Sequence, residues 1–304
     1  MDKTKGFFIS DIYIRLDFND LSFLRRNGLY SHFSQKFIFE NDTFSNKCII
    51  LKYHKRRRNI EELASIFEKY GNTWVKTSGE KFFIIFELSK KYLYVECELN
   101  LLDKTLDIFF DYDAINYYKY VDSLSLTAVD YYLLNPLFLS YNSLIFHSSA
   151  VSLNGKGYLF LGHSTYGKST ICNLLKNNIP EAEALSDDRN LISLRDSNLI
   201  VSSFWREIND LREFKSFSSP ISKIFFIKKS QKNQAIKIDN SLAKTRLFNF
   251  FFRLGGENIN FINDSTKLIF NFSSVFDNFY DLEFTKELDF VDYFKNTIIN
   301  SEEG

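Results

Sequence analysis

The sequence is poor in the residues that interrupt regular structure. Its 304 residues include only 3 Pro and 11 Gly. Flexible linkers are rich in such residues, so the scarcity argues against a long linker, and the length suits one large domain or two ordinary ones. Apolar residues make up 45% of the chain and include 34 Phe and 17 Tyr, which supply ample surface for a packed core.

An excess of charge of one sign is also absent. The 38 Lys and Arg residues balance 38 Asp and Glu residues. The sequence therefore lacks the broad basic footprint of a general nucleic-acid binder, and we expect no nucleic-acid partner. The three cysteines, Cys48, Cys97 and Cys172, form no C-x-x-C pair, which favours reduced and mostly buried thiols.

No long apolar run interrupts the chain. The first residues, MDKTKGFFISDIYIRLDF, contain no apolar segment typical of a signal peptide. The most apolar window, Leu126 to Phe146, carries Asp130, Asn135 and Pro136, which disfavour a bilayer span. We therefore expect a cytoplasmic protein without a membrane segment.

The first part of the chain has the pattern of a mixed α+β module. Phe7 to Phe18 alternates in part between apolar and polar residues, as a half-buried strand does. Asn59 to Tyr70 has the spacing of an amphipathic helix, with Asn59 as its cap and Gly71 as its end. Further strands are expected around Phe37–Phe39, Ile49–Tyr53, Phe82–Phe86, Tyr92–Cys97 and Thr105–Phe110.

Helical patterns dominate three later segments, Ala114 to Asn142, Leu242 to Leu254 and Lys286 to Ile299. A boundary is expected somewhere between residues 110 and 145. We place it so that residues 1–125 form the α+β module and residues 126–304 form a second domain that ends in helices.

The stretch LGHSTYGKSTIC carries the main chemical signal. Its core, G-H-S-T-Y-G-K-S, fits the phosphate-loop pattern G-x-x-x-x-G-K-[ST]. The apolar run Tyr158 to Leu161 precedes it, and Lys168 to Lys176 has a helical pattern, so the context is strand, loop and helix. Loop N–H groups and the helix N-terminus would face phosphates. The expected nucleotide-binding residues are Gly162, His163, Ser164, Thr165, Tyr166, Gly167, Lys168, Ser169 and Thr170.

Two residues of this loop have distinct expected roles. Lys168 can reach the β- and γ-phosphates, and the Ser169 hydroxyl can ligate Mg²⁺. The alternative interpretation is a glycine-containing turn ahead of an ordinary helix.

The residues before the loop predict a hairpin. Leu144 to Leu153 has a strand pattern and is followed by Asn154-Gly155, the strongest short hairpin signal. The strand of the loop would thus be the second arm of an antiparallel hairpin, and His147 would lie on the first arm near the loop.

The segment ALSDDRNLI supplies two adjacent carboxylates, Asp187 and Asp188, after a short apolar approach. Such a pair can divide two tasks, one carboxylate holding Mg²⁺ and the other accepting a proton from an attacking hydroxyl. Standing alone, the pair would favour the interpretation of a solvated Asp-Asp turn, but it follows the loop pattern and the hairpin.

Together, FHSSAVSLNGKGYLFLGHSTYGKST and ALSDDRNLI resemble the catalytic domain of the HPr kinase/phosphorylase family, which is related in fold to phosphoenolpyruvate carboxykinase. The stretch Ser203 to Ile227 is similar to the Trp-containing segment and following strand of that family. Clear resemblance spans residues 143–230. It implies an α/β fold class, with a phosphate-loop catalytic domain built on a mixed β-sheet beside the N-terminal α+β module.

The resemblance implies ATP-dependent phosphoryl transfer to a hydroxyl, usually a serine of a protein or peptide. Ser169 and Asp188 would serve Mg²⁺, and Asp187 is favoured as the base, although sequence does not separate the two aspartates. His147 would lie near the transferred phosphate, Lys168 would bind it, and self-association into a homo-oligomer is expected.

The sequence departs from the family at several points. Thr165 stands where the loop commonly carries glycine, so its backbone should avoid a glycine-only conformation. Thr170 stands where HPr kinases usually carry Glu, and no E-V-R-G-x-G stretch of the phosphorylase is found. The chain thus resembles a kinase relative rather than the HPr enzyme.

Relatives of this kind include kinases that phosphorylate a serine of a lasso-peptide or other ribosomal-peptide precursor. Other relatives act on small hydroxylated molecules such as free serine. A nucleotide-binding regulatory protein without transfer activity is the alternative from a different class.

Overall fold

The computed structural model describes residues 5–18, 46–55, 68–70, 73–78, 81–89, 93–110, 129–203, 217–251 and 259–300. The chain divides into two compact units, the first taking in the chain up to Ser140 and the second starting at Tyr141. By these contacts helix α5 (Val129–Leu139) belongs to the first unit, whereas the predicted boundary between 125 and 126 assigns it to the second.

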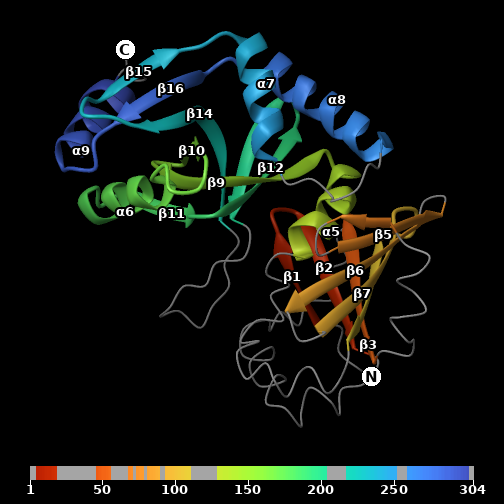
Figure 1. The fold of residues 1–304 in the computed structure, drawn as a ribbon. Coiled ribbons are helices and arrows are strands. Elements are labelled where there is room, and N and C mark those ends of the chain that lie inside the picture. The colour runs from red at the N-terminus through yellow and green to blue at the C-terminus, as the bar shows by residue number, and fades with distance from the viewer. Residues whose placement is uncertain are drawn as a thin grey trace. The chain divides into compact units, whose positions relative to one another are not determined.

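The first unit contains a mixed eight-stranded sheet of order β1-β2-β3-β8-β7-β6-β5-β4 (Figure 1). Its strands are β1 (Lys5–Ile9), β2 (Ile12–Phe18), β3 (Cys48–Lys55), β4 (Glu68–Tyr70), β5 (Thr73–Ser78), β6 (Lys81–Ser89), β7 (Leu93–Asn100) and β8 (Thr105–Phe110). The β2–β3 and β3–β8 pairs are parallel and the other pairs are antiparallel. Alternate residues such as Ile49 and Leu51 are fully buried, as the period of two in a strand requires.

Most strand predictions in this unit are confirmed, but Phe7 to Phe18, predicted as a strand, is divided by a turn at Ser10 and Asp11 into the antiparallel strands β1 and β2. The predicted helix Asn59 to Tyr70 is wrong at its end. Glu68–Tyr70 is strand β4, which pairs antiparallel with β5. Hydrogen bonding to a neighbouring strand overrides the local helical periodicity there. Residues 56–67 and the strand expected at Phe37–Phe39 lie outside the described residues.

The second unit is also built on an eight-stranded mixed sheet, of order β10-β9-β12-β13-β14-β16-β15, with β11 paired to β9. Strand β10 pairs antiparallel with β9 on one side and parallel with β14 on the other. The α/β fold class and the mixed sheet are therefore confirmed. The strands are β9 (Ser143–Leu153), β10 (Lys156–Leu161), β11 (Ala182–Ser186), β12 (Arg189–Arg195), β13 (Asn198–Ser203), β14 (Ser218–Lys229), β15 (Gln234–Lys237) and β16 (Phe279–Phe284).

Helices cover both faces of this second sheet (Figure 1). On one face α6 (Lys168–Asn178), α9 (Asp289–Tyr293) and the π-helix Phe294–Ile299 close over a core that includes Phe160, Leu175 and Phe284. On the other face lie α7 (Asn240–Phe250) and α8 (Ile259–Val275). Phe146 of β9 packs there on Phe272 of α8.

The predicted segments Leu242 to Leu254 and Lys286 to Ile299 are confirmed as helical, with shifted ends. Helix α7 begins earlier than predicted, because the Asp239 carboxylate caps it by accepting a 2.9 Å hydrogen bond from the Leu242 N–H. The C-terminal helix begins at Asp289 rather than Lys286. Of the segment predicted from Ala114, α5 is helical and residues 111–128 lie outside the described part.

Two further expectations concern the burial of the cysteines and the absence of a membrane segment. Cys97 and Cys172 are buried, and Cys48 is partly exposed. Among the described residues, no helix combines the length and the apolar character needed to cross a membrane.

Candidate functional site

The predicted phosphate loop connects β10 to α6, so its strand, loop and helix context is confirmed. Gly167 caps α6 in the left-handed region, with φ of 101°. A Cβ atom added there would lie 2.6 Å from Cζ of Phe284, and one added at Gly162 would lie 2.7 Å from Cγ1 of Ile227. Both positions therefore exclude a side chain, because the loop packs directly on the neighbouring strands.

Thr165 contradicts the prediction that its backbone would avoid a glycine-like conformation. Its φ is +73°, in the left-handed region that β-branched residues rarely adopt. The tight turn of the loop, closed by a 3.1 Å hydrogen bond from the Tyr166 N–H to the His163 carbonyl, imposes this conformation. Backbone strain of this kind costs about 1–3 kcal/mol and clusters at functional sites.

Lys168 is buried within the loop that precedes it. Its ammonium group donates hydrogen bonds to the carbonyl oxygens of Gly162, at 2.8 Å, and His163, at 3.2 Å. Burial lowers the pKa of Lys168, and the nearby Asp188 carboxylate acts in the opposite direction. Both acceptors are neutral backbone carbonyl groups of the loop.

His147 and the second aspartate meet beside this lysine. The Nε2 atom of His147 lies 3.4 Å from Oδ1 of Asp188, and Nε of Arg189 lies 2.9 Å from Oδ2 of Asp188. Burial, followed by the charge of Lys168, lowers the pKa of His147, while Asp188 raises it. His147 and Arg189 therefore both contact the Asp188 carboxylate, and Lys168 is close enough to influence the pKa of His147.

Strand β9 brings these groups together. Because alternate residues of a strand share a face, His147 and Ser149 lie on the face that carries Val151 into the core beneath α6. The Ser149 hydroxyl donates a 3.0 Å hydrogen bond to the Lys168 carbonyl, which joins the start of α6 to β9.

A second attachment joins β9 to the aspartate pair. The Ser148 N–H donates to the Asp188 carbonyl at 3.1 Å, and the buried Asn190 amide donates to the Ser148 carbonyl at 2.9 Å. Ser148, Ser149 and Asn190 were not among the predicted site residues. The two serines that follow His147 could have indicated this role. Adjacent polar residues in an otherwise apolar strand need hydrogen-bond partners when they are buried.

The remaining predicted residues are accessible. Asp187, Ser164 and Ser169 are exposed, and Thr170 is half-buried at the start of α6. No cluster of three or more His, Cys, Asp or Glu residues that could hold a metal occurs within the described ranges. Ser169 and Asp188 are nevertheless hard oxygen donors of the kind Mg²⁺ prefers, and Mg²⁺ usually takes only one or two protein ligands beside substrate phosphates.

Aromatic residues border the loop on the side of α7. The His163 ring lies 5.3 Å from the Tyr166 ring and 5.3 Å from the Phe250 ring, between centroids. Phe250 in turn packs at 6.2 Å on Phe226 of β14. The aromatic contacts with Phe250 were not predicted, because Phe250 is distant from the loop in the sequence.

A cavity of about 340 Å³ lies at the opposite end of the hairpin, where Asn154, Gly155, Glu181 and Glu183 line it. Strand β10 separates this cavity from the phosphate loop, so it is not part of the site described above.

Comparison with known proteins does not place this chain in a family. Neither the scan against protein-family models nor the search of curated proteins finds a match.

Proposed function

We propose that this chain is an ATP- and Mg²⁺-dependent kinase, similar to HPr kinases, that transfers the γ-phosphate to a serine or threonine hydroxyl of a peptide or protein. One observation carries the proposal. The lysine of the phosphate loop, Lys168, lies in the electrostatic field of Asp188, which also contacts His147, although the three residues come from three separate elements. A glycine turn ahead of an ordinary helix would not require that convergence.

The loop and its lysine would bind the phosphates of the nucleotide. N–H groups at the start of α6 provide donors, and the positive end of the helix adds a favourable potential. Lys168 would exchange its two carbonyl partners for phosphate oxygens, and its charge would offset the charge that develops during transfer. Ser149 would hold the lysine's backbone in place through its hydrogen bond to the Lys168 carbonyl.

The aspartates would divide the remaining tasks. Asp187 is exposed, so an acceptor hydroxyl can approach it. Asp187 would accept the hydroxyl proton while the acceptor oxygen bonds to the γ-phosphorus and the bond from that phosphorus to the β–γ bridging oxygen breaks. Asp188 and Ser169 would hold Mg²⁺, which neutralises phosphate charge when bound. His147, whose pKa is lowered by burial, would stand beside the transferred group as a neutral imidazole.

The decisive experiment measures ATP-dependent phosphorylation of serine-containing peptides by mass spectrometry. Lys168→Ala should lower the rate at least about 100-fold, as removal of a group that stabilises transition-state charge does. Lys176→Ala, an exposed lysine of the same helix, is the matched control and should keep the wild-type rate. Retained turnover in Lys168→Ala would refute the proposal. Phosphorylation of free serine but of no peptide would move the acceptor to a small molecule.

The same assay separates the two carboxylates. Asp188→Asn should raise the Mg²⁺ concentration needed for half-maximal rate. Asp187→Asn should lower the maximal rate by about 100-fold or more at unchanged Mg²⁺ dependence, because it removes the base. The opposite pattern would exchange the two roles.

A further inference from the structure

The edge of the second sheet that carries the phosphate loop also carries two lysines. Strands β10, β14 and β16 are adjacent and parallel, so their carboxyl ends lie at the same edge. The loop follows β10, Lys229 ends β14, and Lys286 follows β16 closely. In α/β sheets ligands bind at the carboxyl ends of such strands.

Lys229 lies against the loop itself. Its Cε atom would be 3.5 Å from a Cβ added at Gly167, the residue that caps α6. Phe284, the register partner of Lys229 on β16, contacts the same glycine. The side chain of Lys229 is therefore on the face of the sheet that α6 covers, while Lys228 points to the opposite face.

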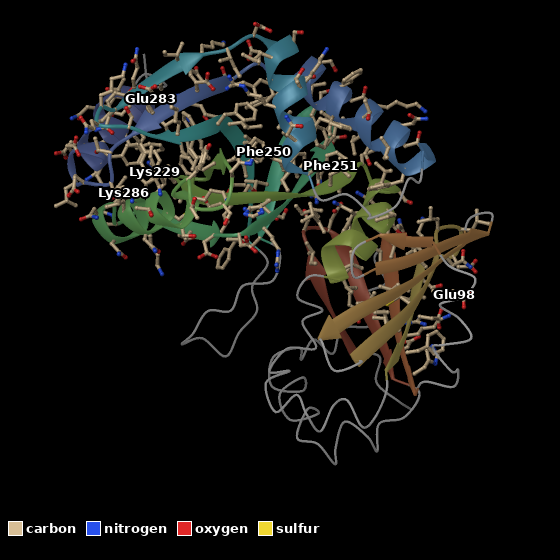
Figure 2. All side chains as sticks on the ribbon, in the orientation of Figure 1. Glu98, Lys229, Phe250, Phe251, Glu283 and Lys286 are labelled. Carbon is tan, nitrogen blue, oxygen red and sulfur yellow. The ribbon has the colours of Figure 1, made fainter. Side chains whose placement is uncertain are left out.

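Lys229 and Lys286 lie near each other, and both carry positive charge. Figure 2 shows the two labelled residues as neighbours at this edge. Partial desolvation and the charge of Lys286 lower the pKa of Lys229. The Glu283 carboxylate lies on the opposite face of the sheet, where it pairs with Lys228 at 3.7 Å and Lys232 at 3.3 Å. Two like charges held together beside a phosphate loop create a local potential that favours an anion.

We propose that Lys229 and Lys286 form a second cationic contact for the phosphate chain of the bound nucleotide, on the side of the loop away from His147 and Asp188. Strand β10 lies between the two sides, since β9 carries His147 and β14 carries Lys229. Transfer chemistry would then take place on one side, and the lysine pair would hold the phosphates from the other. This inference rests on the proposed nucleotide site.

The test measures binding of ATP, ADP and AMP by calorimetry to the wild-type chain and to a Lys229→Gln/Lys286→Gln variant. The dissociation constant for ATP should rise about 10- to 100-fold, the range expected for loss of charge-assisted hydrogen bonds. The effect should be smallest for AMP. The salt dependence of ATP binding should also become weaker, because fewer exposed charges contribute.

Lys228→Gln/Lys232→Gln is the matched control, since it removes two lysines from the same region that pair with Glu283. Its affinity for ATP should stay within about twofold of wild type, as expected for exposed ion pairs. The thermal unfolding midpoint of the Lys229/Lys286 variant should not fall, because the variant removes two neighbouring like charges.

Different failures lead to different conclusions. If Lys168→Ala loses ATP binding and the Lys229/Lys286 variant does not, the lysine-pair inference is overturned while the nucleotide site stands. If the variant keeps its ATP affinity but raises the KM of the acceptor peptide, the pair serves the acceptor, and the inference is again overturned. If the wild-type chain binds no nucleotide, both proposals fall.

Discussion

The Ser149 hydroxyl on β9 donates a 3.0 Å hydrogen bond to the carbonyl oxygen of Lys168, the first residue of α6. Both residues are buried. This bond ties the residue that would bind phosphate to the strand that carries His147. The bond therefore connects the part of the candidate site that contains Lys168 to the part that contains His147.

Replacement of Ser149 by alanine tests this link. Loss of the buried bond should lower the free energy of unfolding by about 1–2 kcal/mol and weaken ATP binding severalfold, because Lys168 is less well held. Ser152→Ala is the control, since Ser152 is also on β9 and bonds the Ser219 hydroxyl at 2.7 Å. Urea unfolding and calorimetry should show similar destabilisation but normal ATP affinity in the control. Equal ATP affinities in both variants would contradict the positioning role.

The strained backbone of Thr165 predicts a stabilising substitution. Thr165→Gly should raise the free energy of unfolding by about 1 kcal/mol, since relief of the positive φ outweighs the added flexibility of glycine in the unfolded chain. Thr170→Gly, within α6, should instead lower it by about 0.5 kcal/mol. Chemical denaturation measures both. Equal destabilisation of the two variants would contradict a strained backbone at Thr165.

Gly167 and Gly155 separate backbone strain from steric clash. Both have positive φ, 101° and 74°, but a Cβ at Gly155 meets nothing within 4 Å, whereas one at Gly167 meets Phe284. Gly155→Ala should cost about 1 kcal/mol of stability, and Gly167→Ala should cost more and also abolish ATP binding. A Phe284→Leu substitution should partly rescue Gly167→Ala, as measured by urea unfolding. No rescue would mean that the clash is not the cause.

His147 predicts an acid-side loss of stability. Burial and Lys168 place its pKa below the ordinary value of 6.5 in the folded chain. Below pH 6.5 the unfolded state therefore binds more protons than the folded state. The free energy of unfolding should fall as the pH drops from 6.5 through the pKa of His147 in the folded chain. His147→Gln should reduce this decline, while His163→Gln, in the exposed loop, should retain it. Parallel stability curves for wild type and His147→Gln would exclude the effect.

Local features of the fold could be predicted because their causes are local. The Asn154-Gly155 turn shows positive φ at both residues, 51° and 74°, as an Asn-Gly hairpin requires. The strand, loop and helix around Lys168 likewise follow from apolar periodicity and glycine placement. The helix prediction was wrong at Glu68–Tyr70 because its cause is not local. Pairing with β5 is not visible in the periodicity of the segment.

The residue pattern was therefore sufficient to predict the loop between β10 and α6, the hairpin that precedes it and an aspartate pair near a strand end. The contact of Asp188, rather than Asp187, with His147 and the positive φ of Thr165 became visible in the folded structure. Tertiary structure also placed Lys229 beside Gly167, through the parallel pairing of β10 with β14. The physical reason is that hydrogen-bonded turns and alternating burial depend on residues a few positions apart. Contacts across a sheet depend instead on which distant strands pair and in which register.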